Sequence, residues 1–315
     1  MSVSVLRIYL FRDFSVEQDG SPLTGFENRK VKELFAYMLL NYTRSHRRES
    51  LTTLLWPDTN PNKSQRNMRQ MLWQLQRRLE LNFNNDGQRP LLVDGDWIQI
   101  NPQVEICCDV LLFRRAYERV QGVAGRELDR EMADTLREAV TLYRGELLEG
   151  WYQEWCLVER ENLQILFLMM LDKLMDYCEA HRYYEEGIGY GMRSLKVDLS
   201  RERSHRRMMR LYTIAGDRSS ALRQFEQCAT YLRKELNVEP AERTQELYEH
   251  ICNNEPLTSE LALKQAQRLQ DKPLAANFDF SRLLSNLAQL TTDLDSAYWR
   301  IQQDIKAVTE FLQGT

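Results

Sequence analysis

The apolar residues of positions 109–253 recur at helical spacing almost without interruption, and this pattern constrains the fold more than any other feature. Residues three and four positions apart share one face of a helix, so the pattern predicts amphipathic helices. A shift of about 34 residues aligns small side chains with one another, such as Gly187 with Ala221 and Ser194 with Cys228. The region is therefore predicted to be an all-α array of stacked helix pairs, whose concave surface is suited to protein partners.

The N-terminal part of the chain follows a different pattern. β-branched and aromatic runs within residues 3–26, interrupted by the turn sequence DGSP, predict short strands. Three helical segments come next, and the last of them, residues 62–80, is expected to be capped by Asn62 or Ser64. The sequence RPLLVDGDWIQI then predicts a hairpin that turns at residues 94–96. Strands, three helices and a hairpin are the layout of a winged helix with an N-terminal sheet.

The last of these three helices separates apolar residues from hydrogen-bond donors. Its apolar positions recur at helical spacing: Met68, Met71, Leu72, Leu75 and Leu79. Its other face carries Lys63, Arg66, Asn67, Gln70, Gln74 and Arg77, and the only carboxylate of the segment is Glu80. In helix-turn-helix modules this helix enters the major groove, where its outer face donates to phosphates and base edges. We therefore predict a DNA-reading helix, since an ordinary surface helix would carry glutamates.

The charge of the chain is unevenly distributed. The formal net charge is -4, yet residues 29–78 contain far more Lys and Arg than Asp and Glu. A basic patch in an acidic chain indicates a local polyanion partner. A solvated surface would show the same imbalance, so charge alone leaves both interpretations open.

The sequence lacks the motifs of catalytic and metal sites. The four histidines lie in unrelated contexts, and the six cysteines show neither C-x-x-C nor Cys/His metal spacing. We expect no enzymatic activity, no metal and no cofactor. With no signal peptide and no apolar run of membrane-spanning length, we expect a cytoplasmic protein without a membrane partner.

Several segments carry a resemblance to a known family. They are NRKVKELFAYMLL, LLWPD, NMRQMLWQLQRRLE, YRGELLEGWYQEWCLVERENL, SHRRMMRLYTIAGDRSSALRQFEQC and LRKELNVEPAERTQELYEHI. In these segments the chain resembles the Streptomyces antibiotic regulatory protein (SARP) family. Its members join an OmpR-type winged helix-turn-helix to a bacterial transcriptional activation domain with TPR-like helices. The resemblance implies a mainly α protein with a small β component. We expect a DNA-binding domain at 1–105, an activation domain at 106–253 and a C-terminal helical segment at 254–315.

The resemblance also implies a function and a set of site residues. Such proteins are similar in being transcriptional activators that bind direct repeats in double-stranded promoter DNA and contact RNA polymerase. The recognition role falls on Lys63, Arg66, Asn67, Arg69, Gln70, Gln74 and Arg77. We expect Arg47 and Arg48 to contact phosphates. The polymerase contact is expected in the loop WPDTNPNK and on the surface of the helical domain.

The chain departs from the family pattern at two places. Trp73 stands where the family usually has a small residue, so either base readout is unusual there or Trp73 is buried. The hairpin turn Asp94-Gly95-Asp96 is acidic, which argues against deep insertion into the minor groove. Arg89 is the candidate that anchors the wing instead.

Two other functions are compatible with parts of the sequence. A TPR-type interaction scaffold would account for the helical region, although it has no need of the acid-poor face of residues 62–78. A ligand-sensing regulator is the second alternative, with an anion held by a basic run: Arg201, Arg203, Arg206, Arg207 and Arg210. We expect this run to be a solvated helix face.

The C-terminal segment has an apolar seam of its own. From Leu283 to Leu312, apolar residues follow one another at steps of three or four. A helix cannot leave such a seam exposed to water. We expect it to mediate self-association into a homo-oligomer, with packing against the repeats as the alternative.

Overall fold

The computed structural model describes residues 6–18, 20–23, 25–82, 89–104 and 106–255. An N-terminal sheet has the strand order β3-β2-β1-β7, where β1 spans Leu6–Tyr9, β2 Ser15–Gln18, β3 Ser21–Pro22 and β7 Cys107–Cys108. β1 and β2 are antiparallel, whereas β7 runs parallel to β1. The sheet therefore joins the N-terminal strands to a strand that lies just beyond residues 1–105, the region predicted to be the winged-helix domain.

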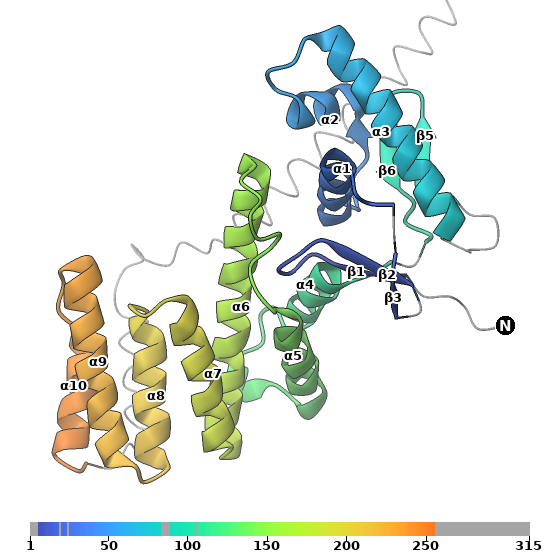
Figure 1. The fold of residues 1–315 in the computed structure, drawn as a ribbon. Helices are drawn as coiled ribbons and strands as arrows, with labels where there is room; N and C mark the ends of the chain where they lie inside the picture. Colours follow the sequence, from blue (N-terminus) through green and yellow to red (C-terminus); the bar gives the residue numbers. More distant parts are fainter. Residues whose placement is uncertain (1–5, 19, 24, 83–88, 105, 256–315) are drawn as a thin grey trace, which may run out of the picture. The chain divides into compact units, whose positions relative to one another are not determined.

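Three helices and a small sheet form the winged helix itself (Figure 1). The helices are α1 (Arg29–Leu40), α2 (Arg48–Leu55) and α3 (Pro61–Asn82). The sheet has the order β4-β6-β5, with β4 at His46–Arg47, β5 at Leu91–Asp94 and β6 at Trp97–Ile100. Strand β6 places Ile98 and Ile100 in the core and alternates them with more exposed residues, as a one-sided strand should. The predicted hairpin with its turn after Asp94 is confirmed.

The rest of the described chain is helical. It contains α4 (Asp109–Arg119), a short 3-10 helix (Gly125–Glu127), α5 (Arg130–Leu142) and α6 (Glu154–His181). These are followed by α7 (Tyr184–Val197), α8 (Glu202–Ile214), α9 (Arg218–Leu236) and α10 (Glu242–Cys252). Consecutive helices from α6 onward pack on one another, so the predicted array of helix pairs is confirmed (Figure 1). The self-association element predicted at the C-terminus lies outside the described residues.

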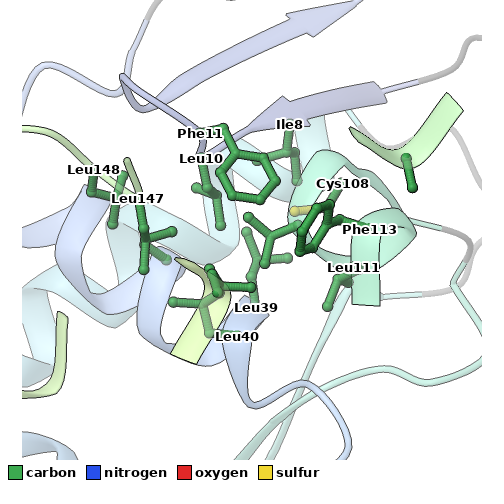
Figure 2. Close-up of a cluster of buried hydrophobic side chains, with 14 of the residues drawn as sticks. Ile8, Leu10, Phe11, Leu39, Leu40, Cys108, Leu111, Phe113, Leu147 and Leu148 are labelled. Carbon is green, nitrogen blue, oxygen red and sulfur yellow. The ribbon is translucent and has the colours of Figure 1, made fainter. Parts of the chain in front are cut away.

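A continuous apolar cluster joins the N-terminal sheet to the helices that follow (Figure 2). It brings Leu10 and Phe11 against Phe113 of α4 and Leu147 of the segment before α6. At its edge the buried carboxylate of Asp109 accepts hydrogen bonds from the backbone N–H groups of Leu10 and Phe11 at 2.9 and 3.0 Å. These contacts fix the start of the helical part to the first strand.

Two glycines allow α7 to approach its neighbours closely. A Cβ added at Gly187 would lie 3.0 Å from Cys178 on α6 and 3.0 Å from Leu211 on α8. A Cβ at Gly191 would lie 2.4 Å from the side chain of Met208. The small residues that define the sequence repeat are therefore required where the helices come closest.

We expect the substitution Gly191→Leu to lower the free energy of unfolding by about 1–3 kcal/mol, because added methylenes have no space beside Met208. The control is Gly189→Leu in the same helix, since a Cβ at Gly189 meets nothing within 4 Å. Urea denaturation followed by circular dichroism compares the two variants. Equal midpoints would contradict the proposed close packing of α7.

The basic run that begins at Arg201 is not the solvated face that its sequence predicts, because four of its five arginines pair with carboxylates of α6. Arg201 donates to both carboxylate oxygens of Asp172 at 2.8 Å. Arg207 donates to Asp176 at 2.7 and 2.8 Å, and Arg210 bonds to Glu179 at 2.6 Å. The expectation fails because the acids that face these arginines belong to another helix. The ion pairs also leave the ligand-sensing alternative without support from this run.

Candidate nucleic-acid interface

Helix α3 begins at Pro61, and its N-terminus is capped by Asn60. The Asn60 side chain accepts a hydrogen bond from the backbone N–H of Asn62 at 3.0 Å, and its carbonyl accepts from the next two N–H groups. The expected cap at Asn62 or Ser64 is therefore wrong. Ser64 is instead buried, and its hydroxyl donates to the Pro61 carbonyl at 3.0 Å. Proline is favoured at the first helical position, because its missing N–H has no partner to lose there.

The apolar stripe of α3 lies in the core. All five predicted apolar residues are buried: Met68, Met71, Leu72, Leu75 and Leu79. Of the predicted site residues on α3, six are exposed, namely Lys63, Arg66, Arg69, Gln70, Trp73 and Arg77, while Asn67 and Gln74 are half-buried at the flanks. No carboxylate occurs between Pro61 and Leu79. The outer face of α3 thus presents a row of donors at steps of three and four residues.

Trp73 lies in the middle of this row. Its side chain is 57% exposed, so the structure excludes the possibility that it is a core residue. The guanidinium carbon of Arg77 lies 5.2 Å from the centre of the Trp73 ring. Stacking of this kind holds an arginine and an indole in a defined relative position.

A groove of about 580 Å³ separates α3 from the N-terminus of α2 and the tip of the wing. The basic residues that line it are Arg47, Arg48 and Arg69. Arg47 stacks on Trp97 at 5.3 Å, and the backbone N–H of Arg48 donates to the Asp96 carbonyl at 2.7 Å. The wing tip is thus attached to the start of α2, next to the exposed face of α3.

Two acidic side chains moderate the charge of this groove, Glu49 and Asp96. The groove therefore combines three arginines with two carboxylates, while the outer row of α3 carries no acid at all. A polyanion is attracted most strongly where cations are unopposed. The exposed row of α3 accordingly carries positive charge that no carboxylate of the same helix opposes between Pro61 and Leu79.

Arg89 does not lie at the tip of the wing. It lies just before β5, at the base of the hairpin, and its side chain is exposed. The carboxylate of Glu80, near the end of α3, lies 3.9 Å from its guanidinium group. From this position Arg89 extends the basic surface beyond the C-terminal half of α3.

Gln65 and Trp97 are among the residues lining the groove that the sequence did not identify as site residues. Trp97 could have been identified from the alternation in β6, because Ile98 and Ile100 point into the core and leave Trp97 on the outer face. Gln65 sits beside the outer row on the helical wheel, and only the groove reveals its neighbours.

The described residues contain no group of three or more His, Cys, Asp or Glu side chains placed to hold a metal. None of the helices in the same part of the chain is both long enough and apolar enough to cross a membrane.

Comparisons with known proteins agree with this architecture. The family model for the bacterial transcriptional activator domain matches residues 108–252. The solved structure of Mycobacterium tuberculosis EmbR, in complex with a low affinity phosphopeptide, is similar with a TM-score of 0.63 and 17% identity. The match covers 87% of this chain and 73% of EmbR.

A second solved structure matches with a TM-score of only 0.32, which is too low to indicate a shared fold. It is the C-terminal TPR-containing domain of a Plasmodium falciparum FK506-binding protein, with 16% identity over 51% of this chain and 91% of that chain. No curated protein matches the chain. The family match and the fold shared with EmbR agree with the resemblance seen in the sequence: residues 108–252 form a bacterial transcriptional activator domain, and the chain shares with EmbR a fold in which a winged helix precedes these helices.

Proposed function

We propose that this chain binds promoter DNA in a sequence-specific way through α3 and activates transcription by contacting RNA polymerase through its helical part. In this proposal residues 1–105 read DNA, and the polymerase is contacted by the loop WPDTNPNK, residues 56–63, and by the surface of residues 106–253. The observation that carries it is the exposed row of donors on α3, which is free of carboxylates from Pro61 to Leu79. An interaction scaffold has no use for such a row, whereas a major-groove reader depends on it.

The proposed roles follow from the position of each residue. Arg66, Gln70 and Arg77 stand furthest from the core and are assigned to base edges, with Lys63, Asn67, Arg69 and Gln74 beside them. Arg47 and Arg48 at the start of α2, and Arg89 at the base of the hairpin, are assigned to phosphates. Selection of duplexes from a random pool by the full chain tests this assignment. Enrichment of one sequence repeated in a single orientation supports it, and equal recovery of all sequences contradicts it.

The polymerase contact is assigned to the exposed apolar residues at the N-terminal half of α6. This surface consists of Leu157, Val158 and Ile165 on α6, together with Tyr152 just before the helix. Val158 and Ile165 are seven positions apart and therefore share one face of α6, and exposed apolar side chains that lie together are typical of protein interaction sites. The surface lies on the helix that also contacts α4 and the N-terminal part of the chain, through Arg114–Glu159 and Tyr37–Trp155.

We expect Val158→Glu combined with Ile165→Glu to leave DNA affinity unchanged and to reduce activated transcription at least about tenfold, since a central interface residue contributes about 2 kcal/mol or more. In vitro transcription with purified polymerase measures the activation, and a mobility-shift assay measures DNA affinity. Leu236→Glu is the matched control, because Leu236 is equally apolar and exposed but lies at the end of α9. Full activation by the double variant would refute the assigned surface.

A further inference from the structure

Trp73 is a large apolar side chain at the centre of a face that otherwise consists of cations and amides. Its neighbours along the outer row of α3 are Arg66, Gln70 and Arg77. A tryptophan that is 57% exposed leaves a large apolar area in water, which is unfavourable unless a partner covers it. The charge around it indicates what the partner is, because a row of donors without acids complements a polyanion rather than a protein surface of mixed charge.

The major groove of DNA offers only one apolar group on its base edges. Guanine, adenine and cytosine present donors and acceptors there, whereas thymine adds the C5-methyl group. The carbon edges of an indole ring can form no hydrogen bond, and its single N–H is a donor. Among the base-edge groups of the major groove, the thymine methyl is therefore the one against which the apolar surface of Trp73 can be buried.

The stacked arginine defines what lies beside that thymine. Arg77 is held 5.2 Å from the centre of the Trp73 ring, so the two side chains approach the groove as a unit. An arginine on a base edge pairs with O6 and N7 of guanine through two parallel hydrogen bonds. The pair thus combines an apolar contact for thymine with a bidentate contact for guanine.

We propose that Trp73 is a specificity-determining residue that packs on the C5-methyl group of a thymine, next to a guanine bound by Arg77. The inference rests on the proposed function, since it requires that α3 enters the major groove. It adds that each half-site contains a thymine and a guanine close together. It also explains why this chain has a tryptophan at position 73, where the family that it resembles usually has a small residue.

The test uses the full chain and a duplex selected by it. Each thymine is replaced singly by deoxyuridine, which removes the methyl group and keeps base pairing. At one thymine in each half-site we expect binding to weaken about fourfold, which corresponds to the burial of one methyl-sized group, about 0.8 kcal/mol. The variant Trp73→Ala should bind the thymine and deoxyuridine duplexes equally at that position. Replacing the same thymine by 5-methylcytosine, opposite guanine, should cost less than replacing it by cytosine.

Trp97→Ala is the matched control, because Trp97 is also an exposed tryptophan stacked on an arginine, but lies on the wing. It should retain the full sensitivity to deoxyuridine at the Trp73 position. The inference is overturned if no thymine shows the methyl effect in the wild type, or if Trp73→Ala keeps it. Absence of any selected duplex would instead overturn the proposed DNA binding itself, so the two failures are distinguishable. The deoxyuridine measurement on the wild type remains decisive if the alanine variant does not fold.

Discussion

Replacing Arg66 and Arg77 together by alanine should weaken binding to the selected operator about 30-fold or more, without unfolding the chain. The magnitude follows because each bidentate base contact contributes about 1–3 kcal/mol of discrimination. Both side chains are exposed on the outer row of α3, so their removal leaves the core intact. Binding to unrelated DNA should fall much less, since the variant gives up base recognition and keeps most of its interactions with phosphates. Mobility shifts on operator and unrelated duplexes measure both affinities.

The contrasting variant is Arg47→Ala combined with Arg48→Ala. These residues lie at the start of α2, and we assign them to phosphates, so the variant should weaken binding to all sequences alike. The slope of log affinity against log salt should fall by about one for each phosphate that the variant no longer neutralises. Thermal melting of each protein serves as the folding control. Wild-type operator affinity in the Arg66→Ala/Arg77→Ala double variant would contradict the assignment of α3 as the reading helix.

A second large effect is expected at Asp172, where Asp172→Ala should lower the free energy of unfolding by about 3–5 kcal/mol. The carboxylate is buried at 4% exposure and lies within 3.3 Å of guanidinium nitrogens of Arg201, Arg203 and Arg207. Removing it leaves three cations close together without their shared counter-charge. A change of this size is a large fraction of the total stability of an ordinary domain.

Urea denaturation of wild type and variant measures this change in stability. Glu239→Ala is the control, because Glu239 forms an ion pair of similar length with Arg233 at 2.7 Å but both partners are exposed. Exposed pairs contribute little, so the control should behave like the wild type. An Asp172→Ala midpoint equal to that of the control would show that the α6–α8 ion pairs do not stabilise the fold.

We also expect the free energy of unfolding to depend on pH through the carboxylate of Asp172. Burial by itself raises the pKa of Asp172, but the hydrogen bonds and charges of Arg201, Arg207 and Arg203 outweigh burial and lower the pKa below its ordinary value. The unfolded chain therefore binds this proton at a higher pH than the folded chain does. The stabilisation is present above the ordinary carboxyl pKa, about 3.9, and is lost as pH falls through the folded value. Asp172→Asn should lack this part of the acid-induced loss of stability.

The sequence predicts those features of the fold that are encoded locally. The burial of Met68, Leu75 and Leu79 follows from helical spacing alone, because one face of an amphipathic helix must be covered. The turn after Asp94 follows from its own residues in the same way. Local patterns therefore predict the existence of α3, of the hairpin and of the helical array.

Interactions between distant segments cannot be predicted from such local patterns. Arg207 and Asp176 are 31 positions apart, and Asp109 is 99 positions from Leu10. A pattern of apolar residues within one helix or strand is much shorter than these separations, so it cannot show that the two partners meet. The cap of α3 at Asn60 was missed for a simpler reason. The helix begins one residue earlier than its apolar pattern suggests, and polar residues on both sides of Pro61 are suitable caps.

In the candidate site, too, the features of a single helix are predictable from the sequence and the contacts between elements are not. The row of donors on α3 is visible in the sequence, but the orientation of Trp73 was undecided because a tryptophan at that position fits either a core or an exposed face. The groove beside the wing depends on how β4, α2 and α3 come together, which brings Arg47, Arg69 and Trp97 to one place. Spacing within a single helix contains no information about that arrangement.

Genomic footprinting of the bound full chain tests most directly whether α3 selects promoter DNA for transcriptional activation. The wild type is expected to protect discrete sites upstream of promoters, each with a short sequence repeated in one orientation, and transcription from those promoters should rise with occupancy. The Arg66→Ala/Arg77→Ala variant, present at the same level, should lose these footprints. Footprints that persist in that variant, or a wild-type protein that protects no discrete sites, would contradict the account.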